Sequence, residues 1–239
     1  MDQSRLDNVV WACLSGPHRE FAEGGALALR YRRGYSPIAA LAEPSAAAYA
    51  ELAALSQRDE QIFLPFAGDR PPSPWIVEVE EPVLQMIATA PIVERPAEFA
   101  PVRLGDADVP AMMALTELTR PGPFGPLTHR LGTYIGVKVG GRLVAMAGER
   151  FAVPGHREIS AVCTHPDWQG RGLARMLMAR LAAAMAREGI TPFLHVLAEN
   201  RTAIGLYERL GFRARRTIPL RVLRLEPGGA VATPRGSAI

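Results

Sequence analysis

A short turn with two glycines is the part of the chain whose residues most clearly predict chemistry. Glu158–Thr164 is expected to form a strand, and it is followed by a turn and a helix whose first residues include Gly170, Gly172 and Ala174. N–H groups at the start of a helix lack intrahelical partners, and the helix dipole adds roughly +0.5 elementary charge there. Glycine has no Cβ, so an anion can approach the backbone closely. The turn therefore predicts a site for the phosphate of a cofactor.

The elements after this turn place it between two strands of one sheet. Apolar residues in Gly172–Glu188 repeat with a period near 3.6, and Gly189 is typical of a residue that ends a helix. Phe193–Leu197 is almost continuously apolar, as buried parallel strands are. A strand, a helix and a parallel strand form a right-handed crossover. Asn200 or Thr202 can then cap a second helix.

The segments before the turn are expected to alternate strands, helices and proline-rich breaks. From about residue 95 onward we expect a strand at Val102–Leu104, a helix that begins near Val109, strands at Thr133–Val139 and Leu143–Phe151, and one or two strands in Phe212–Leu225. In residues 1–95 we expect strands at Ala26–Tyr31 and Glu60–Phe66, a helix at Ala46–Leu55, and a hairpin or two short strands at Trp75–Val79 and Val83–Ala88. No chemical motif stands out in residues 1–95, so a structural or substrate-covering role is expected there.

Bulk composition excludes several classes of protein. The chain of 239 residues is 48% hydrophobic and 21% charged, which is typical of a globular protein. Its formal charge of +3 is small and no basic block alternates with aromatic residues, so nucleic acid is not an expected partner. No apolar run approaches the ~20 residues that span a bilayer, and the N-terminus does not resemble a secretory signal. Cys13 and Cys163 are far apart, which predicts no disulfide framework, no metal site and a reducing, cytoplasmic location.

The turn and the segment 198–212 together closely resemble the GNAT superfamily of acyl-CoA-dependent N-acyltransferases. The superfamily's turn pattern, Gln/Arg-x-x-Gly-x-Gly/Ala, is matched by Gln169, Gly172 and Ala174. Its second pattern is matched by Asn200, Ala203, Leu206-Tyr207 and Leu210-Gly211-Phe212. The resemblance covers about residues 101–225, and within the superfamily it is greatest to predicted acetyltransferases akin to glycine N-acyltransferases.

This resemblance implies an α/β (α+β) fold with a mixed central sheet and helices on both faces. Residues 96–227 are expected to form the catalytic GNAT domain. Residues 1–95 are expected to form a preceding α/β half, for which a degenerate copy of the same fold is one interpretation. Residues 228–239 are rich in Gly, Pro and Ala and are expected to form a flexible tail.

The resemblance also implies that acetyl-CoA, or another short acyl-CoA, is the co-substrate and that no metal is needed. Its pyrophosphate would lie on the N–H groups of the turn, with charge-assisted contacts from Arg171 and Arg175. Its pantetheine arm would pair with the end of the preceding strand, where the N–H of Val162 would polarise the thioester carbonyl. The expected cofactor-binding residues are Val162, Cys163, Thr164, Gln169, Gly170, Arg171, Gly172, Leu173, Ala174, Arg175, Asn200, Ala203 and Tyr207.

Three residues are candidates for moving protons. An alkylammonium has a pKa near ~10 and must lose a proton before it can attack a thioester. Glu158 matches the general base of some GNAT members, and His195 lies where other members place a base glutamate. Deprotonation in solution is the third alternative. Tyr207 matches the tyrosine that donates a proton to the departing thiolate.

These features predict an enzyme that transfers an acetyl or short acyl group from CoA to a primary amine by direct attack. The alternative is a non-catalytic, regulatory protein that binds acyl-CoA. The acceptor, a small molecule or a peptide, should meet the segment Thr119–Leu131, where Phe124 and His129 could face it. A monomer or a homodimer is expected. A nucleotide-binding Rossmann domain is excluded, because the glycine turn comes late and no acidic residue follows it at the required place.

Overall fold

Two sheets organise the molecule, whose computed structural model describes residues 3–65, 68–94, 96 and 98–227. A three-stranded sheet has the order β1 (Ala22–Gly24), β2 (Ala28–Tyr31) and β3 (Ala39–Leu41). The larger, eight-stranded sheet has the order β4 (Ile62–Pro65), β11 (Phe212–Leu225), β5 (Trp75–Ala88), β10 (Thr191–Leu197), β9 (His156–Thr164), β8 (Arg142–Val153), β7 (Tyr134–Val139) and β6 (Val102–Arg103). The expected tail at 228–239 lies outside the described residues.

The sheet is mixed, and helices cover both of its faces, as the fold class predicted. The helices are α1 (Val9–Leu14), α2 (Ala46–Leu55), α3 (Val109–Thr119), α4 (Leu173–Arg187) and α5 (Arg201–Arg209). Strands β9 and β10 pair in parallel, whereas the other named pairs are antiparallel. α4 and α5 pack on one face of the sheet, and α1 and α3 pack on the other.

Local signals explain where these helices begin. The Ser45 hydroxyl accepts a hydrogen bond from the N–H of Ala48 at the start of α2, and Asn200 Oδ1 accepts one from the N–H of Ala203 at the start of α5. Side chains supply these caps because the first N–H groups of a helix have no backbone partner. At α4 the capping residue is Gly172, which has no side chain to offer, so the first N–H groups of that helix keep no side-chain partner.

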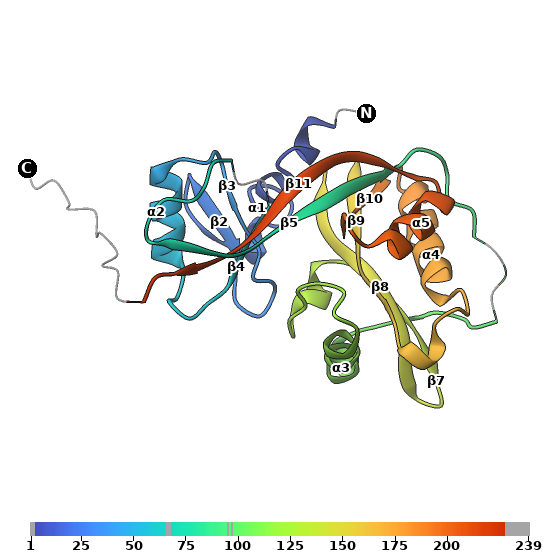
Figure 1. Cartoon of the computed structure of the whole chain (residues 1–239). Coiled ribbons are helices and arrows are strands. Elements are labelled where there is room, and N and C mark those ends of the chain that lie inside the picture. Colours follow the sequence, from blue (N-terminus) through green and yellow to red (C-terminus); the bar gives the residue numbers. More distant parts are fainter. Residues whose placement is uncertain (1–2, 66–67, 95, 97, 228–239) are drawn as a thin grey trace, which may run out of the picture.

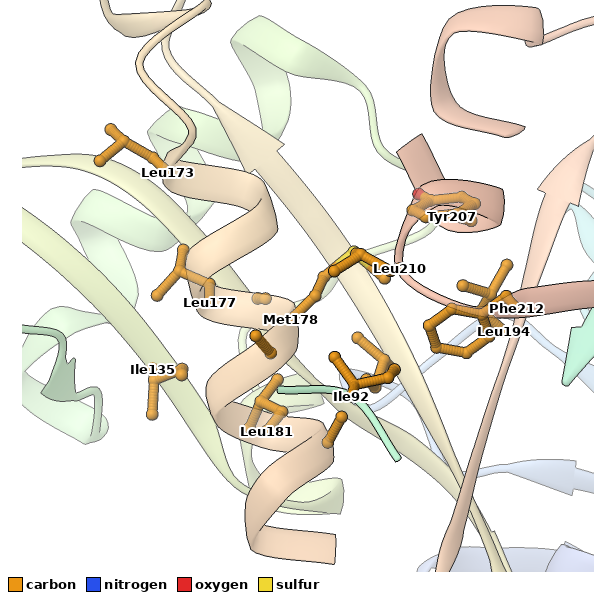
Figure 2. Close-up of a cluster of buried hydrophobic side chains, with 14 of the residues drawn as sticks. Ile92, Ile135, Leu173, Leu177, Met178, Leu181, Leu194, Tyr207, Leu210 and Phe212 are labelled. Carbon is orange, nitrogen blue, oxygen red and sulfur yellow. The ribbon is translucent and has the colours of Figure 1, made fainter. Parts of the chain in front are cut away.

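The main core lies between α4 and the sheet. Leu177, Met178 and Leu181 on α4 pack against Ile135 and Leu194 from the strands, all of them buried (Figure 2). Full burial of one such side chain stabilises the fold by about 1.5–3 kcal/mol. The same cluster extends to α5, so the core fixes the positions of α4 and α5 relative to the sheet.

Strand β5 ties the first third of the chain to the rest. It pairs with β10 on one side and with β11 on the other. The two long strands β5 and β11 lie side by side and extend from the part of the molecule that holds α2 to the part that holds α4 and α5 (Figure 1). The expected hairpin at Trp75–Val79 and Val83–Ala88 is wrong, because β5 continues through Pro82 as one strand. Pro82 is tolerated there although it lacks an N–H donor. Phe212–Leu225 is likewise one strand, bent by two register shifts.

The division expected at residues 95 and 96 therefore does not separate the two sheets. β4 and β5 come from residues 1–95, and both belong to the eight-stranded sheet. Within the described residues no helix is both long and apolar enough to cross a bilayer.

One close contact inside the sheet gives a test of the β7–β8 register. Gly148 on β8 faces Tyr134 on β7, and a Cβ at position 148 would lie 2.3 Å from the buried ring. We expect Gly148→Ala to lower the free energy of unfolding by about 1–3 kcal/mol, because the added methyl group must displace the ring. Urea denaturation measures the change. The control is Gly105→Ala, where the new Cβ meets nothing within 4 Å; equal stability of the two variants would contradict the register.

Candidate active site

The site begins where β9 and β10 part. The two strands pair over three positions only, from His156 opposite Thr191 to Glu158 opposite Phe193. Beyond these positions β10 continues along β5, and β9 continues along β8. A cavity of about 460 Å³ lies at the opening between the two strands. A gap between two parallel strands can take an extended amide chain, because both strand edges there have unpaired backbone groups.

The cavity is lined by much of the cofactor-binding set expected from the sequence. Tyr207 and Ala203 reach it from α5, and Gln169 reaches it from the glycine turn. The other members of that set that line it are Val162, Cys163, Thr164 and Asn200. Residues that are far apart in the sequence are thus brought to one opening.

A second hollow, of about 250 Å³, lies at the start of α4. Arg171, Gly172, Leu173 and Arg175 line it, whereas Gly170 and Ala174 line neither hollow. Gly170 and Gly172 have positive φ angles of 76° and 75°, a conformation that glycine adopts without strain. The free N–H groups of α4 and two arginines therefore lie at one place, as a pyrophosphate site requires.

Packing against aromatic residues holds this turn. The Arg171 guanidinium lies 4.5 Å from the centre of the Trp168 ring, and Trp168 meets Phe99 edge to face. A cation over an aromatic face is attracted by the ring's quadrupole. Arg171 is therefore positioned by its neighbours before any anion binds.

A bulge in β9 lies beside Val162, and the sequence did not reveal it. Ser160 pairs with Gly148 and Cys163 with Met146, so two residues of β9 stand opposite Ala147 alone. Ala161, one of these two, has a φ of 51°, which is rare for a residue with a Cβ. Such bulges redirect the backbone and are frequent next to active sites. Here the bulge takes the Val162 backbone out of the regular ladder at the cavity.

Tyr207 is buried at the edge of the core that α4 forms with the sheet (Figure 2). It packs against Phe212, and burial raises the pKa of its hydroxyl from 10.0 to about 12. The group therefore stays protonated at neutral pH. Asn200 caps α5 and also lines the cavity, so its capping and its cofactor-contact roles are compatible.

Glu158 is fully buried in an ion pair with Arg150. Arg150 Nε lies 2.7 Å from Glu158 Oε2, and Nη2 lies 2.9 Å from Oε1. Burial alone would raise the pKa of Glu158, but Arg150 and the hydrogen bond from His195 lower it from 4.5 to about 2. A carboxylate with so low a pKa is a weak proton acceptor at neutral pH, and Glu158 does not line the cavity.

His195 lines the cavity and links Glu158 to the first half of the chain. Its Nδ1 lies 2.7 Å from Glu158 Oε1, and its Nε2 lies 3.1 Å from Gln85 Nε2. The pattern fits an imidazole that donates from Nδ1 and accepts at Nε2. The Gln85 amide cannot simply turn over, since its nitrogen also donates to the Leu6 carbonyl and its oxygen accepts from Arg215.

Gln85 and Arg150 are site residues that the sequence did not reveal. Gln85 lies on β5 and is fully buried, and the segment that holds it contains no recognisable motif. Arg150 could have been considered, because a cation within an apolar strand requires a partner. No local signal identifies Glu158 as that partner.

The acceptor side differs in detail from the expectation for Thr119–Leu131. Thr119, Arg120 and the Pro121–Pro123 run line the cavity. Phe124 instead packs edge to face against Tyr134, and His129 pairs with Asp106 at 2.6 Å. Neither of them lines the cavity. The first half of the chain completes the cavity through Val10, Ile38, Phe63 and Pro65.

Burial also governs the chemistry of Cys163. Cys163 is buried, and burial raises the pKa of its thiol from 9.0 to about 11, so little thiolate forms at neutral pH. In the part of the chain that the structure describes, no group of three or more His, Cys, Asp and Glu side chains is arranged to hold a metal ion.

The buried Glu158–Arg150 pair predicts how stability depends on pH. We expect Glu158→Gln to lower the free energy of unfolding at pH 7 by about 3–5 kcal/mol, because Arg150 stays buried without its carboxylate. The folded pKa is depressed, so the stabilisation is present above pH 4.5 and is lost as the pH falls toward 2. The difference from the unsubstituted protein should therefore shrink over that range in urea denaturation.

The control for this prediction is Glu188→Gln. Glu188 is more than half exposed and pairs with Arg157, so its removal should cost at most about 1 kcal/mol. A difference between Glu158→Gln and the unsubstituted protein that stays constant down to pH 2 would contradict the buried pair.

Comparison with known proteins identifies N-acetyltransferases as relatives of this chain. The family model described as FR47-like protein matches residues 134–220. The N-alpha-acetyltransferase RimI of Mycobacterium tuberculosis is 33% identical over 137 residues, which are 56% of this chain and 80% of RimI. A ribosomal protein bS18-alanine N-acetyltransferase of Salmonella typhimurium is 46% identical over 52 residues, covering 21% of this chain and 35% of that enzyme.

Solved structures agree along almost the whole chain. A protein from Novosphingobium aromaticivorans, assigned to the GNAT family of acetyltransferases, has a TM-score of 0.85 at 41% identity and covers 93% of this chain and 99% of that one. A GCN5-related N-acetyltransferase from Kribbella flavida shares the fold, with a TM-score of 0.61 at 18% identity over 93% of this chain and 96% of that one. The chain thus belongs to the GNAT superfamily and is an enzyme of its N-acetyltransferase family.

Proposed function

We propose that this enzyme transfers an acetyl or short acyl group from CoA to a primary amine by direct attack. One observation carries the proposal: a single cavity has Tyr207 and Ala203 of α5 at one end and residues of the first half, such as Val10 and Phe63, at the other. These two groups of residues lie on opposite faces of the sheet, and the cavity joins them at the opening between β9 and β10. A donor and an acceptor can therefore meet from opposite sides.

The donor end suits acetyl-CoA. The start of α4, with Arg171 and Arg175, would hold the pyrophosphate. The pantetheine arm would follow Val162–Thr164 into the opening. The Val162 N–H, released from the ladder by the bulge, would donate to the thioester oxygen as negative charge develops on it. The known activities of RimI and its relatives support an amine as the acceptor, because these enzymes are named N-acetyltransferases.

The chemistry needs three proton movements. The ammonium loses one proton to become the neutral amine, whose nitrogen then attacks the thioester carbon. As the new C–N bond forms and the C–S bond breaks, the nitrogen loses its second proton and the departing sulfur takes up one. We assign proton acceptance to His195 and the positioning of its ring to Glu158, because Glu158 is bound by Arg150 and its pKa is about 2. The amine must compete with Gln85 for the Nε2 lone pair. Tyr207, protonated at neutral pH, would donate to the sulfur.

A cytoplasmic location is part of this proposal. Cys13 and Cys163 are both free and buried, which suits a reducing compartment.

Two measurements test the proposed activity. Calorimetry should detect acetyl-CoA binding, and thiol release from acetyl-CoA should depend on added amine in a screen of amino acids, polyamines, aminoglycosides and peptide N-termini. Binding without metal ions is expected. No binding heat at millimolar acetyl-CoA, together with no amine-dependent thiol release, would refute the proposal.

Tyr207→Phe separates chemistry from binding. We expect kcat to fall by about 10²-fold, the lower end of what positioned proton transfer contributes. The dissociation constant for CoA should change by less than about threefold, because the ring and its contact with Phe212 remain. Steady-state kinetics and calorimetry on the same preparation give both numbers. An unchanged kcat would remove Tyr207 from the mechanism.

A further inference from the structure

The wall that the first half of the chain contributes to the cavity is mostly apolar. Val10, Ile38, Phe63 and Pro65 come from the first half of the chain, and Phe151 comes from β8. An apolar chamber of this kind favours an acceptor with an apolar body, because each buried methylene group contributes favourably to binding.

One carboxylate interrupts these apolar walls. Glu81 lies on β5, and side chains alternate along a strand, so Glu81, Val83 and Gln85 point to the same face. Gln85 reaches His195, whereas Val83 and Glu81 line the cavity. Gln85 is four positions along the strand from Glu81, which corresponds to roughly 13 Å. Glu81 is therefore too far along β5 to hold the amine that reacts beside His195.

No neighbouring side chain balances the negative charge of the Glu81 carboxylate among the residues that the structure describes. On β11, Leu220 stands opposite Glu81 and Ile218 stands opposite Val83, and both line the cavity. The next acid along the strand, Glu80, pairs with Arg221. No hydrogen bond or ion pair joins the Glu81 carboxylate to another of the residues that the structure describes.

Two cationic residues, Arg120 and Arg150, also line the cavity. Arg150 is engaged by Glu158, and Arg120 is exposed at the end of α3. A half-buried carboxylate among apolar side chains attracts a cation more strongly than a carboxylate in water, because screening is weaker there.

We propose that the acceptor is an amine with an apolar body and a second cationic group, which pairs with Glu81 while the reacting nitrogen lies beside His195. This inference rests on the proposed acyl transfer and names its substrate class. The two nitrogens of the acceptor would be roughly 10 Å apart. This is the length of β5 from Glu81 to Gln85, shortened because the side chains at the two ends reach toward the acceptor. Acceptors with a carboxylate at that distance would be repelled.

A series of diamines tests the spacing. α,ω-Diaminoalkanes from diaminobutane to diaminododecane are compared with monoalkylamines of the same length at pH 7, where both ends of a diamine are charged. We expect kcat/KM for the longer diamines to exceed that of the matching monoamines by about tenfold, because an ion-paired hydrogen bond contributes that much. The advantage should be small for the shortest diamines, which cannot reach Glu81.

Two matched variants assign the effect to one carboxylate. Glu81→Gln keeps the shape and removes the charge, so the ratio of diamine to monoamine kcat/KM should fall to near one. Glu80→Gln, one residue away on the opposite face, should keep the ratio. Calorimetry of diamines and monoamines, with the protein saturated with CoA, reads out the same preference without turnover.

The outcomes separate this inference from the proposed function. Equal binding and turnover of diamines and monoamines by the unsubstituted protein, or a diamine preference that survives Glu81→Gln, would overturn the role of Glu81 while leaving acyl transfer intact. Failure of acetyl-CoA binding and of thiol release with every amine would refute acyl transfer itself.

Discussion

The separation of β9 from β10 is the constraint on which the rest of the structure depends. A strand that leaves its neighbour exposes backbone N–H and C=O groups along that edge, where a ligand can pair with them. The other edge of β10 pairs with β5 along five positions. The opening can therefore stay free for an extended ligand because a strand from a distant part of the chain holds β10 in place.

The charges of the site follow from the same arrangement. Glu158 is the last residue of β9 to pair with β10, and it lies fully buried where the strands begin to part. A carboxylate there is tolerated only because Arg150 binds it with two hydrogen bonds and His195 donates a third. Bound in this way, the carboxylate fixes the ring of His195 at the cavity wall. The ion pair at the point where the strands part therefore determines the orientation of the His195 imidazole.

The sequence predicts the parts of this site that depend on local chemistry. Glycines with positive φ, the Asn200 cap and the 3.6-residue period of α4 are local signals, and the structure has each of them in place. Contacts between distant parts of the chain have no such local signal. Which strand fills the free edge of β10, and which cation neutralises Glu158, depend on contacts between residues far apart in the chain. The same reason explains why β5 was expected to break at Pro82, since a proline at a strand position signals a turn unless its surroundings are known.

Sharing β5 between the acceptor wall and the catalytic wall has a consequence for how such proteins diversify. Val83 lines the cavity, and Gln85, two residues along the same strand, holds His195. A recombination event that joined the first third of one relative to the remainder of another would exchange Val83 and Gln85 at the same time. New acceptor preferences should therefore arise by point substitution at alternate positions of β5 and on α1 or β4. Wholesale domain shuffling would replace the proton-handling machinery together with the specificity.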